Sequence, residues 1–164
     1  MCQTLLSVLI FAVAVCASNA ASSSDISSIT LEYTACFGTC PMYTVTIFRD
    51  GRVVYEGKGF VKARGVRRKS IPVIKFIHLT EKLSEIGFFQ LRNAYRSNIT
   101  DLPRIFIAVT RGSETKSVED YYGAPKKLRD FEDMFDRTID IGSWVNLSDK
   151  EAQSEWDRAY RTHR

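Results

Sequence analysis

The chain has 164 residues, of which 45% are hydrophobic and 26% charged, and its formal net charge is +4. This length suits one domain with a hydrophobic core of its own. The positive charge is compatible with anionic surfaces but is too small to indicate a nucleic-acid binder. No period of repeat-protein length recurs, so the composition favours a single ordinary globular domain.

The N-terminal segment has the pattern of a secretory leader. Residues 5–15 are apolar except for Ser7, and this stretch is shorter than the about 20 residues that a bilayer requires. Small residues follow at 18–20, where a signal peptidase cleaves. We expect a signal peptide over residues 1–20, no transmembrane span after cleavage, and a periplasmic or secreted protein. Residues 1–4 contain no Lys or Arg, which leaves an uncleaved anchor as the alternative.

Cleavage would leave two cysteines, Cys36 and Cys40, four residues apart. An even pair in an exported chain predicts one disulfide, and closing so short a loop stabilises the fold by roughly 2 kcal/mol. Two thiolates also suit Cu(I), and the Cys-x-x-x-Cys-Pro spacing is similar to the copper site of Sco-type copper chaperones. Those proteins have a thioredoxin-like order of elements and add a downstream histidine, which this chain does not supply. A thiol-redox or Cu(I) site at these cysteines stays as an alternative.

Apolar and polar residues alternate over 29–34 and again over 43–48, which predicts two half-buried strands. The Asp50-Gly51 turn that follows is best read as a type I turn with Gly51 in a left-handed bulge. That turn sets Val45 opposite Tyr55, so that the apolar residues share one face.

Residues 57–69 predict a further strand at a sheet edge. Its basic side chains protect such an edge from aggregation, or they form a docking patch for an anionic partner. They are Lys62, Arg64, Arg67, Arg68 and Lys69.

Two helices are predicted, each after a set of strands. Ser70 is expected to cap the first, with Pro72 in its first turn and Gly87 at its end. Its apolar face is Val73, Phe76, Ile77, Leu83 and Ile86, which leaves His78 facing solvent. Strands over 105–109 and 118–121 precede the second helix, which Pro125 opens and Gly142 ends. Its buried face is Leu128, Phe131, Phe135 and Ile139.

This order predicts an α+β fold with a mostly antiparallel sheet of about five to six strands. Two helices are expected to pack on one face, in the order strands, helix, strands, helix. The domain is predicted over residues 29–145. Residues 146–164 form a tail with a short helix, for which Ser148 and Glu151 give a capping box.

No catalytic constellation is recognisable. The folded region offers only His78 as a histidine, and no phosphate-binding loop or zinc signature is present. We therefore expect no enzyme activity, no cofactor and no metal. Asp101 and Asp120 fall at the same end of the sheet, where paired carboxylates bind a cation or do acid–base work. We favour the other interpretation, in which each caps the backbone N–H groups of its own loop.

Five separated motifs stand out along the chain: residues 35–43 (ACFGTCPMY), 50–57 (DGRVVYEG), 87–89 (GFF), 100–103 (TDLP) and 120–125 (DYYGAP). Together they resemble those of a bacterial family of exported domains of unknown function. The resemblance covers residues 29–145, with Tyr122 in place of the usual glycine, and implies an envelope or secreted location without any activity.

The sequence thus predicts an exported binding or structural module without catalysis, expected to be a monomer. Its partner is an envelope protein or an anionic envelope polymer, and not nucleic acid. An inhibitor or partner-docking domain is a further alternative. The candidate binding surface comprises Phe37, Gly38, Asp101, Asp120, Tyr121, Arg64, Arg67 and Arg68.

Overall fold

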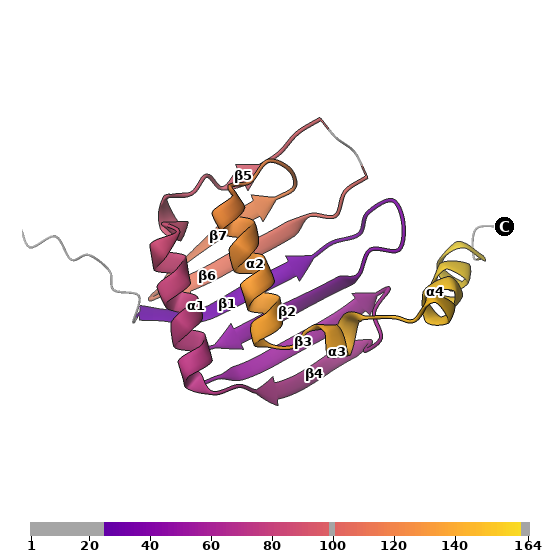
Figure 1. Ribbon diagram of the computed structural model, residues 1–164, viewed down its shortest axis with the longest axis horizontal. Helices are drawn as coiled ribbons and strands as arrows, with labels where there is room; N and C mark the ends of the chain where they lie inside the picture. Colours follow the sequence, from indigo (N-terminus) through magenta and orange to yellow (C-terminus); the bar gives the residue numbers. More distant parts are fainter. Residues whose placement is uncertain (1–24, 99–100, 162–164) are drawn as a thin grey trace, which may run out of the picture.

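The computed structural model describes residues 25–98 and 101–161. It shows one seven-stranded sheet with two helices packed across one face and the C-terminal helix beyond its edge (Figure 1). The strands are β1 (Ile26–Tyr33), β2 (Met42–Phe48), β3 (Arg52–Gly59), β4 (Gly65–Ser70), β5 (Ala94–Tyr95), β6 (Ile105–Arg111) and β7 (Glu114–Asp120). The helices are α1 (Val73–Glu85), the 3₁₀ turn η2 (Phe88–Gln90), α2 (Lys126–Thr138), α3 (Gly142–Val145) and α4 (Asp149–Arg161).

The sheet order is β4-β3-β2-β1-β6-β7-β5. Every neighbouring pair is antiparallel except β5 and β7, which are parallel. The predicted α+β class and mostly antiparallel sheet are confirmed. The predicted signal peptide lies outside the described residues, and none of the described helices has the length and apolar character needed to cross a bilayer.

The predicted strand count and helix order are wrong in detail. β5 has only two residues, too few to show an alternating pattern. The single strand expected over 57–69 is instead the end of β3, a bend, and β4 at the sheet edge. Gly57 explains the close return of the chain, because a Cβ there would lie 2.0 Å from the carbonyl oxygen of Ala63. The short α3 is also additional to the predicted order.

The β2–β3 hairpin has the predicted register. Val45 pairs with Tyr55 and Ile47 with Val53, and Gly51 has a φ of 82° as the left-handed bulge residue. A Cβ on Gly51 would also lie 2.3 Å from the carbonyl oxygen of Ile71. The turn therefore requires glycine for its conformation and for its packing.

The core lies between one sheet face and helices α1 and α2. Inward side chains of the five inner strands are fully buried against the apolar stripes of the two helices. On the other face, the hydroxyls of Thr30 and Thr46 lie 2.8 Å apart, and Lys58 forms an ion pair with Glu32. The fold is thus a two-layer sandwich whose second sheet face is polar, as is usual for antiparallel sheets.

The first helix begins later than predicted. Ser70 ends β4 and pairs with Arg52, so it does not cap α1, whose N-cap is Pro72. The expected apolar face is also partly wrong, because Val73 and Ile77 are exposed. Leu79 is fully buried in α1 instead, whereas Gly87 ends the helix in the left-handed conformation, as predicted.

The second helix has the predicted buried face but ends at Thr138, and Gly142 begins α3 instead of ending α2. Trp144 of α3 packs on Tyr55 with ring centroids 5.0 Å apart. The predicted capping box is confirmed: the backbone N–H of Ser148 donates to Glu151 at 2.8 Å, and the Ser148 hydroxyl donates to the same carboxylate at 2.7 Å. α4 thus begins where the sequence indicates.

Candidate functional site

Three loops leave the sheet at the same end. Tyr33 at the end of β1 pairs with Ile105 of β6, and Ile105 pairs with Asp120 at the end of β7. Residues 34–41, 96–98, 101–104 and 121–125 therefore lie there, and we call this region the loop end (Figure 1, upper part). It contains two neighbouring cavities of about 580 and 550 Å³, which share Leu102 and Tyr121 in their walls.

The larger of these two cavities, the cysteine-side cavity, lies beside the Cys36–Cys40 loop. The two sulfur atoms are at bonding distance with their Cα atoms 5.6 Å apart, as the predicted disulfide requires. The N–H of Gly38 donates to the carbonyl of Cys36 at 3.0 Å and tightens the turn. Phe37 stands at its tip with 85% of its surface exposed.

The lining of the cysteine-side cavity also carries charged groups, two arginines and Asp101. The arginines are Arg96 and Arg104, and both form ion pairs with the buried carboxylate of Glu119. The Arg104 guanidinium also lies 5.0 Å from the ring centroid of Tyr121. The backbone N–H of Thr34 donates to the carbonyl of Arg104 at 3.0 Å, and the N–H of Arg104 donates to the Thr34 hydroxyl at 3.0 Å, so the first two loops are held together.

The second cavity, the acid cavity, lies between the ends of β6 and β7 and the first half of α2. Loop residues form its rim, and three charged side chains reach it from β7 and α2. Its walls are Leu102, Pro103, Ile105, Asp120, Tyr121, Tyr122, Gly123, Arg129 and Glu132. Two carboxyl groups and one guanidinium therefore face a partly apolar space.

Glu132 is the most perturbed acid at this cavity. It is 5% exposed, and burial, followed by the nearby carboxylates of Asp120 and Asp136, raises its pKa to about 8. Burial likewise raises the pKa of Asp120, against the opposing charge of Arg129. Within residues 25–98 and 101–161, the Oε1 atom of Glu132 is buried without a hydrogen-bond partner. A buried polar atom in this state is unusual in a folded protein.

A row of aromatic rings extends from the acids across the sheet. The Tyr33 hydroxyl donates to Asp136 at 2.9 Å, and burial raises the pKa of Asp136 to about 6 against this bond. Tyr33 stacks on Tyr43 with centroids 4.5 Å apart, and Tyr43 lies 5.7 Å from Tyr55. Because these rings are packed, they hold Asp136, one helical turn beyond Glu132, in place.

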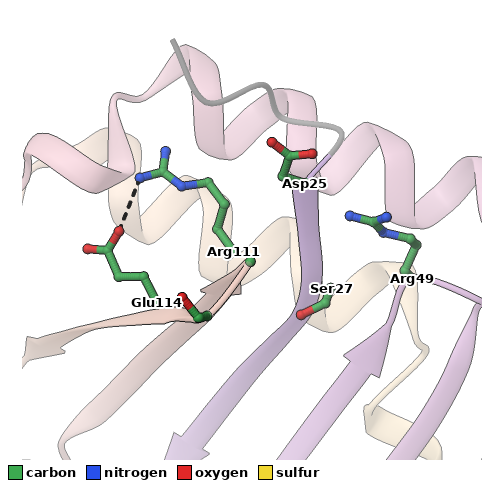
Figure 2. Close-up of a pocket in the computed structure, with 7 residues that line it drawn as sticks. Asp25, Ser27, Arg49, Arg111 and Glu114 are labelled. Carbon is green, nitrogen blue, oxygen red and sulfur yellow. Dashed lines mark hydrogen bonds and ion pairs between the residues drawn. The ribbon is translucent and has the colours of Figure 1, made fainter. Parts of the chain in front are cut away.

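A third cavity, of about 670 Å³, lies at the opposite end of the sheet (Figure 2). Its two arginines contact partners within the protein. Arg49 donates to the carbonyl of Ile26 at 2.9 Å, and Arg111 pairs with Glu114 at 3.4 Å while its guanidinium lies over the Phe89 ring. This cavity therefore offers less to a ligand than the two at the loop end.

The loop end brings together one part of the predicted binding surface. Phe37, Asp101 and Tyr121 line the cysteine-side cavity with Gly38 in the same loop, and Asp120 lines the acid cavity. Asp101 and Asp120 do not share a cavity, and the carboxyl whose pKa Asp120 raises is Glu132. In the described part of the chain, no group of three His, Cys, Asp or Glu side chains is arranged to hold a metal ion.

The basic residues of the predicted surface lie elsewhere. Arg64 forms an ion pair with Glu155 of α4. On β4, Arg67 pairs with Tyr55 and Arg68 with Val54, so the two point to opposite faces of the sheet. All three lie on or beside edge strand β4, which β3 and β2 separate from β1, and none lines a cavity of the loop end.

Sequence reasoning missed Glu132 and Asp136. The sequence did contain one indication that Glu132 is buried. It falls between Phe131 and Phe135, on the buried stripe of α2 that also carries Leu128. A charged residue on a buried helical stripe is rarely accommodated without a partner.

Comparison with known proteins gives a family without an activity. Residues 27–139 match the family model described as a domain of unknown function (DUF6438). No curated protein matches this chain.

Proposed function

We propose an exported, non-catalytic binding module as the function of this chain, which belongs to the DUF6438 family of domains of unknown function. The contact surface is the loop end. The observation that carries the proposal is the exposure of Phe37 on a loop closed by two cysteines, beside a cavity. Leu102 and Tyr122, which are 40% and 51% exposed, extend the apolar surface along the same two cavities.

Exposed apolar side chains that gather beside a cavity are typical of contact surfaces, whereas isolated ones are not. A bound partner would remove Phe37 from water and so gain the hydrophobic energy that the free domain lacks. The short cysteine loop limits the conformations of Phe37 before binding, which lowers the entropy lost on association. This arrangement favours recognition over a structural role for the loop.

The charges at the loop end do not by themselves select a partner. Arg96 and Arg104 share the carboxylate of Glu119, and Asp101 lines the same cavity, so the formal charges there balance. The preference for an anionic envelope protein or polymer rests on the formal net charge of +4 of the chain. The exported location rests on the leader-like residues 1–20 and on a cysteine pair of the kind that oxidising compartments preserve.

The test is retention of an envelope component by the immobilised domain. We would compare the wild type with Phe37→Ser and with Val66→Ser, a control at an exposed apolar residue of edge strand β4. The wild type and Val66→Ser should retain the same component, and Phe37→Ser should lose it. Equal retention by Phe37→Ser, or no retained component, would refute the proposed surface.

Thiol titration of the protein taken directly from its compartment addresses the remaining alternative. A closed pair should give no free thiols and no tight Cu(I) binding before reduction. Cys36 lines the cysteine-side cavity, so a redox or Cu(I) function predicts free, reactive sulfur at this position.

A further inference from the structure

The acid cavity contains a buried carboxyl group whose hydrogen bonds the described chain does not complete. Glu132 is 5% exposed, lines the cavity and has an unpartnered Oε1 atom. Asp120, 8% exposed, lines the same cavity from β7. Leaving a buried acceptor unpaired costs about 1–3 kcal/mol, and a donor in the cavity recovers this free energy once the carboxyl group turns toward it.

We propose that the acid cavity binds the protonated primary amine of a small organic ligand, with the carboxylates of Glu132 and Asp120 as acceptors. This inference rests on the proposed binding function and adds the chemical class of ligand at one cavity of the loop end. A primary ammonium has three N–H donors and no acceptor, which suits two neighbouring carboxylates.

Other ligand classes fit the cavity less well. A small anion would face two carboxyl groups, and the only cation in the wall, Arg129, already donates to the carbonyl of Ala124. A metal ion would find fewer than three acidic, histidine or cysteine ligands among the residues that the structure describes. A cation with its own carbon skeleton matches the wall better.

The rest of the cavity accommodates such a skeleton. Its volume of about 550 Å³ is within the range typical of small-molecule sites. Leu102, Pro103 and Tyr122 form an apolar rim, and the Tyr122 ring offers a face for an aromatic or aliphatic group. We therefore expect amines with an apolar body to bind better than ammonium itself.

Binding of the amine must be linked to a proton. Glu132 faces Asp120 from β7, and it is flanked on α2 by Asp133, Asp136 and Arg129. With a pKa of about 8, its carboxyl is mostly protonated at neutral pH in the empty cavity. The ammonium favours the ionised form, so the Glu132 proton leaves to solvent on binding. The ionised fraction of Glu132 rises roughly 20-fold between pH 6.5 and 8.5, and the affinity should rise with it.

The experiment uses 2-phenylethylamine as the probe and its neutral N-acetyl derivative as the matched control. Both are titrated into the mature protein while amide resonances are followed by NMR at pH 6.5 and 8.5. The amine should shift resonances around Tyr121 and Glu132 saturably, about 20-fold more tightly at pH 8.5. Glu132→Gln should weaken binding at least tenfold and remove the pH dependence, and Asp120→Asn should weaken binding. Asp130→Asn, at an exposed acid of the same helix that pairs with Lys126, should match the wild type.

The outcomes separate this inference from the proposed function. Equal binding of the N-acetyl derivative, or unchanged binding by folded Glu132→Gln, would overturn the amine site while leaving the loop end as a binding surface. Absence of binding by either probe also overturns it, because the Phe37→Ser comparison tests the proposed function independently. If Glu132→Gln does not fold, the wild-type pH profile and Asp120→Asn decide.

Discussion

Glu132 should make the folded protein less stable as the pH rises from 5 to 8. Burial and neighbouring carboxylates raise its folded pKa from 4.5 to about 8. The unfolded chain therefore releases this proton at a lower pH than the folded one does. The stabilisation that the protonated carboxyl provides is complete below about pH 4.5 and is lost as the pH rises through 8.

The magnitude follows from the two pKa values. Each unit of difference corresponds to 1.36 kcal/mol, so the full loss is about 5 kcal/mol, of which roughly 3.5 kcal/mol falls between pH 5 and pH 8. Because Glu132 is 5% exposed, solvent screening changes this figure little. Asp136, with a pKa of about 6, adds a loss in the same direction at the acidic end of this window.

The assay is urea denaturation of the wild type, Glu132→Gln and Asp130→Asn at pH 5 and pH 8. The substitution Glu132→Gln keeps the shape of the side chain and removes its titration. This variant should lose most of the difference between the two pH values and exceed the wild type in stability at pH 8. Asp130 has a lowered pKa and is already ionised at pH 5, so its variant should follow the wild-type profile. A wild type that is as stable at pH 8 as at pH 5 would refute the reasoning.

Three further predictions concern the scaffold of the loop end and its sheet. Tyr33→Phe removes the 2.9 Å bond to Asp136 and should lower the free energy of unfolding by about 1–2 kcal/mol in urea titrations, with a rise in the Asp136 pKa measured by NMR. Gly51→Ala should cost at least about 1 kcal/mol and more than Gly112→Ala, because both glycines have positive φ but only Gly51 has a neighbouring carbonyl in the way. Replacing Cys36 and Cys40 together by serine should lower stability by roughly 2 kcal/mol under oxidising conditions and leave it unchanged under reducing ones, as thermal denaturation would show.

Local patterns predicted the parts of the fold that depend on neighbouring residues. Alternation identified β1, β2 and β6, and the Asp50-Gly51 turn gave the register of the first hairpin, because only one turn type keeps Val45 and Tyr55 on one face. β5 was missed because its two residues pair with a strand that comes later in the chain. The start of α1 was predicted too early because Ser70 and Pro72 match the pattern of a helix cap. In the structure Ser70 pairs with Arg52 in the sheet, and α1 begins after Pro72.

The residues of the candidate site were likewise predictable only where they depend on local sequence. Phe37, Asp120 and Tyr121 were predictable because strand ends and turn residues bring them to one end of the sheet. Glu132, the carboxyl neighbour of Asp120, was not predictable, because its position depends on how α2 packs over the sheet. Tyr33 and Asp136 are 103 residues apart, and nothing in either local sequence indicates their contact.

An ionisable group at position 132 requires a reason beyond packing. An apolar residue there would complete the buried stripe of α2 and avoid the desolvation penalty that a carboxyl incurs. A site in which ionised Glu132 meets a cation supplies that reason, because ligand binding then offsets the stability lost at higher pH. It follows that 2-phenylethylamine should raise the thermal midpoint of the wild type more at pH 8 than at pH 5, and should leave Glu132→Gln nearly unaffected at both. If Glu132 has a purely structural role, the amine does not bind its ionised carboxylate. The thermal midpoint should then respond to the amine equally at pH 5 and pH 8.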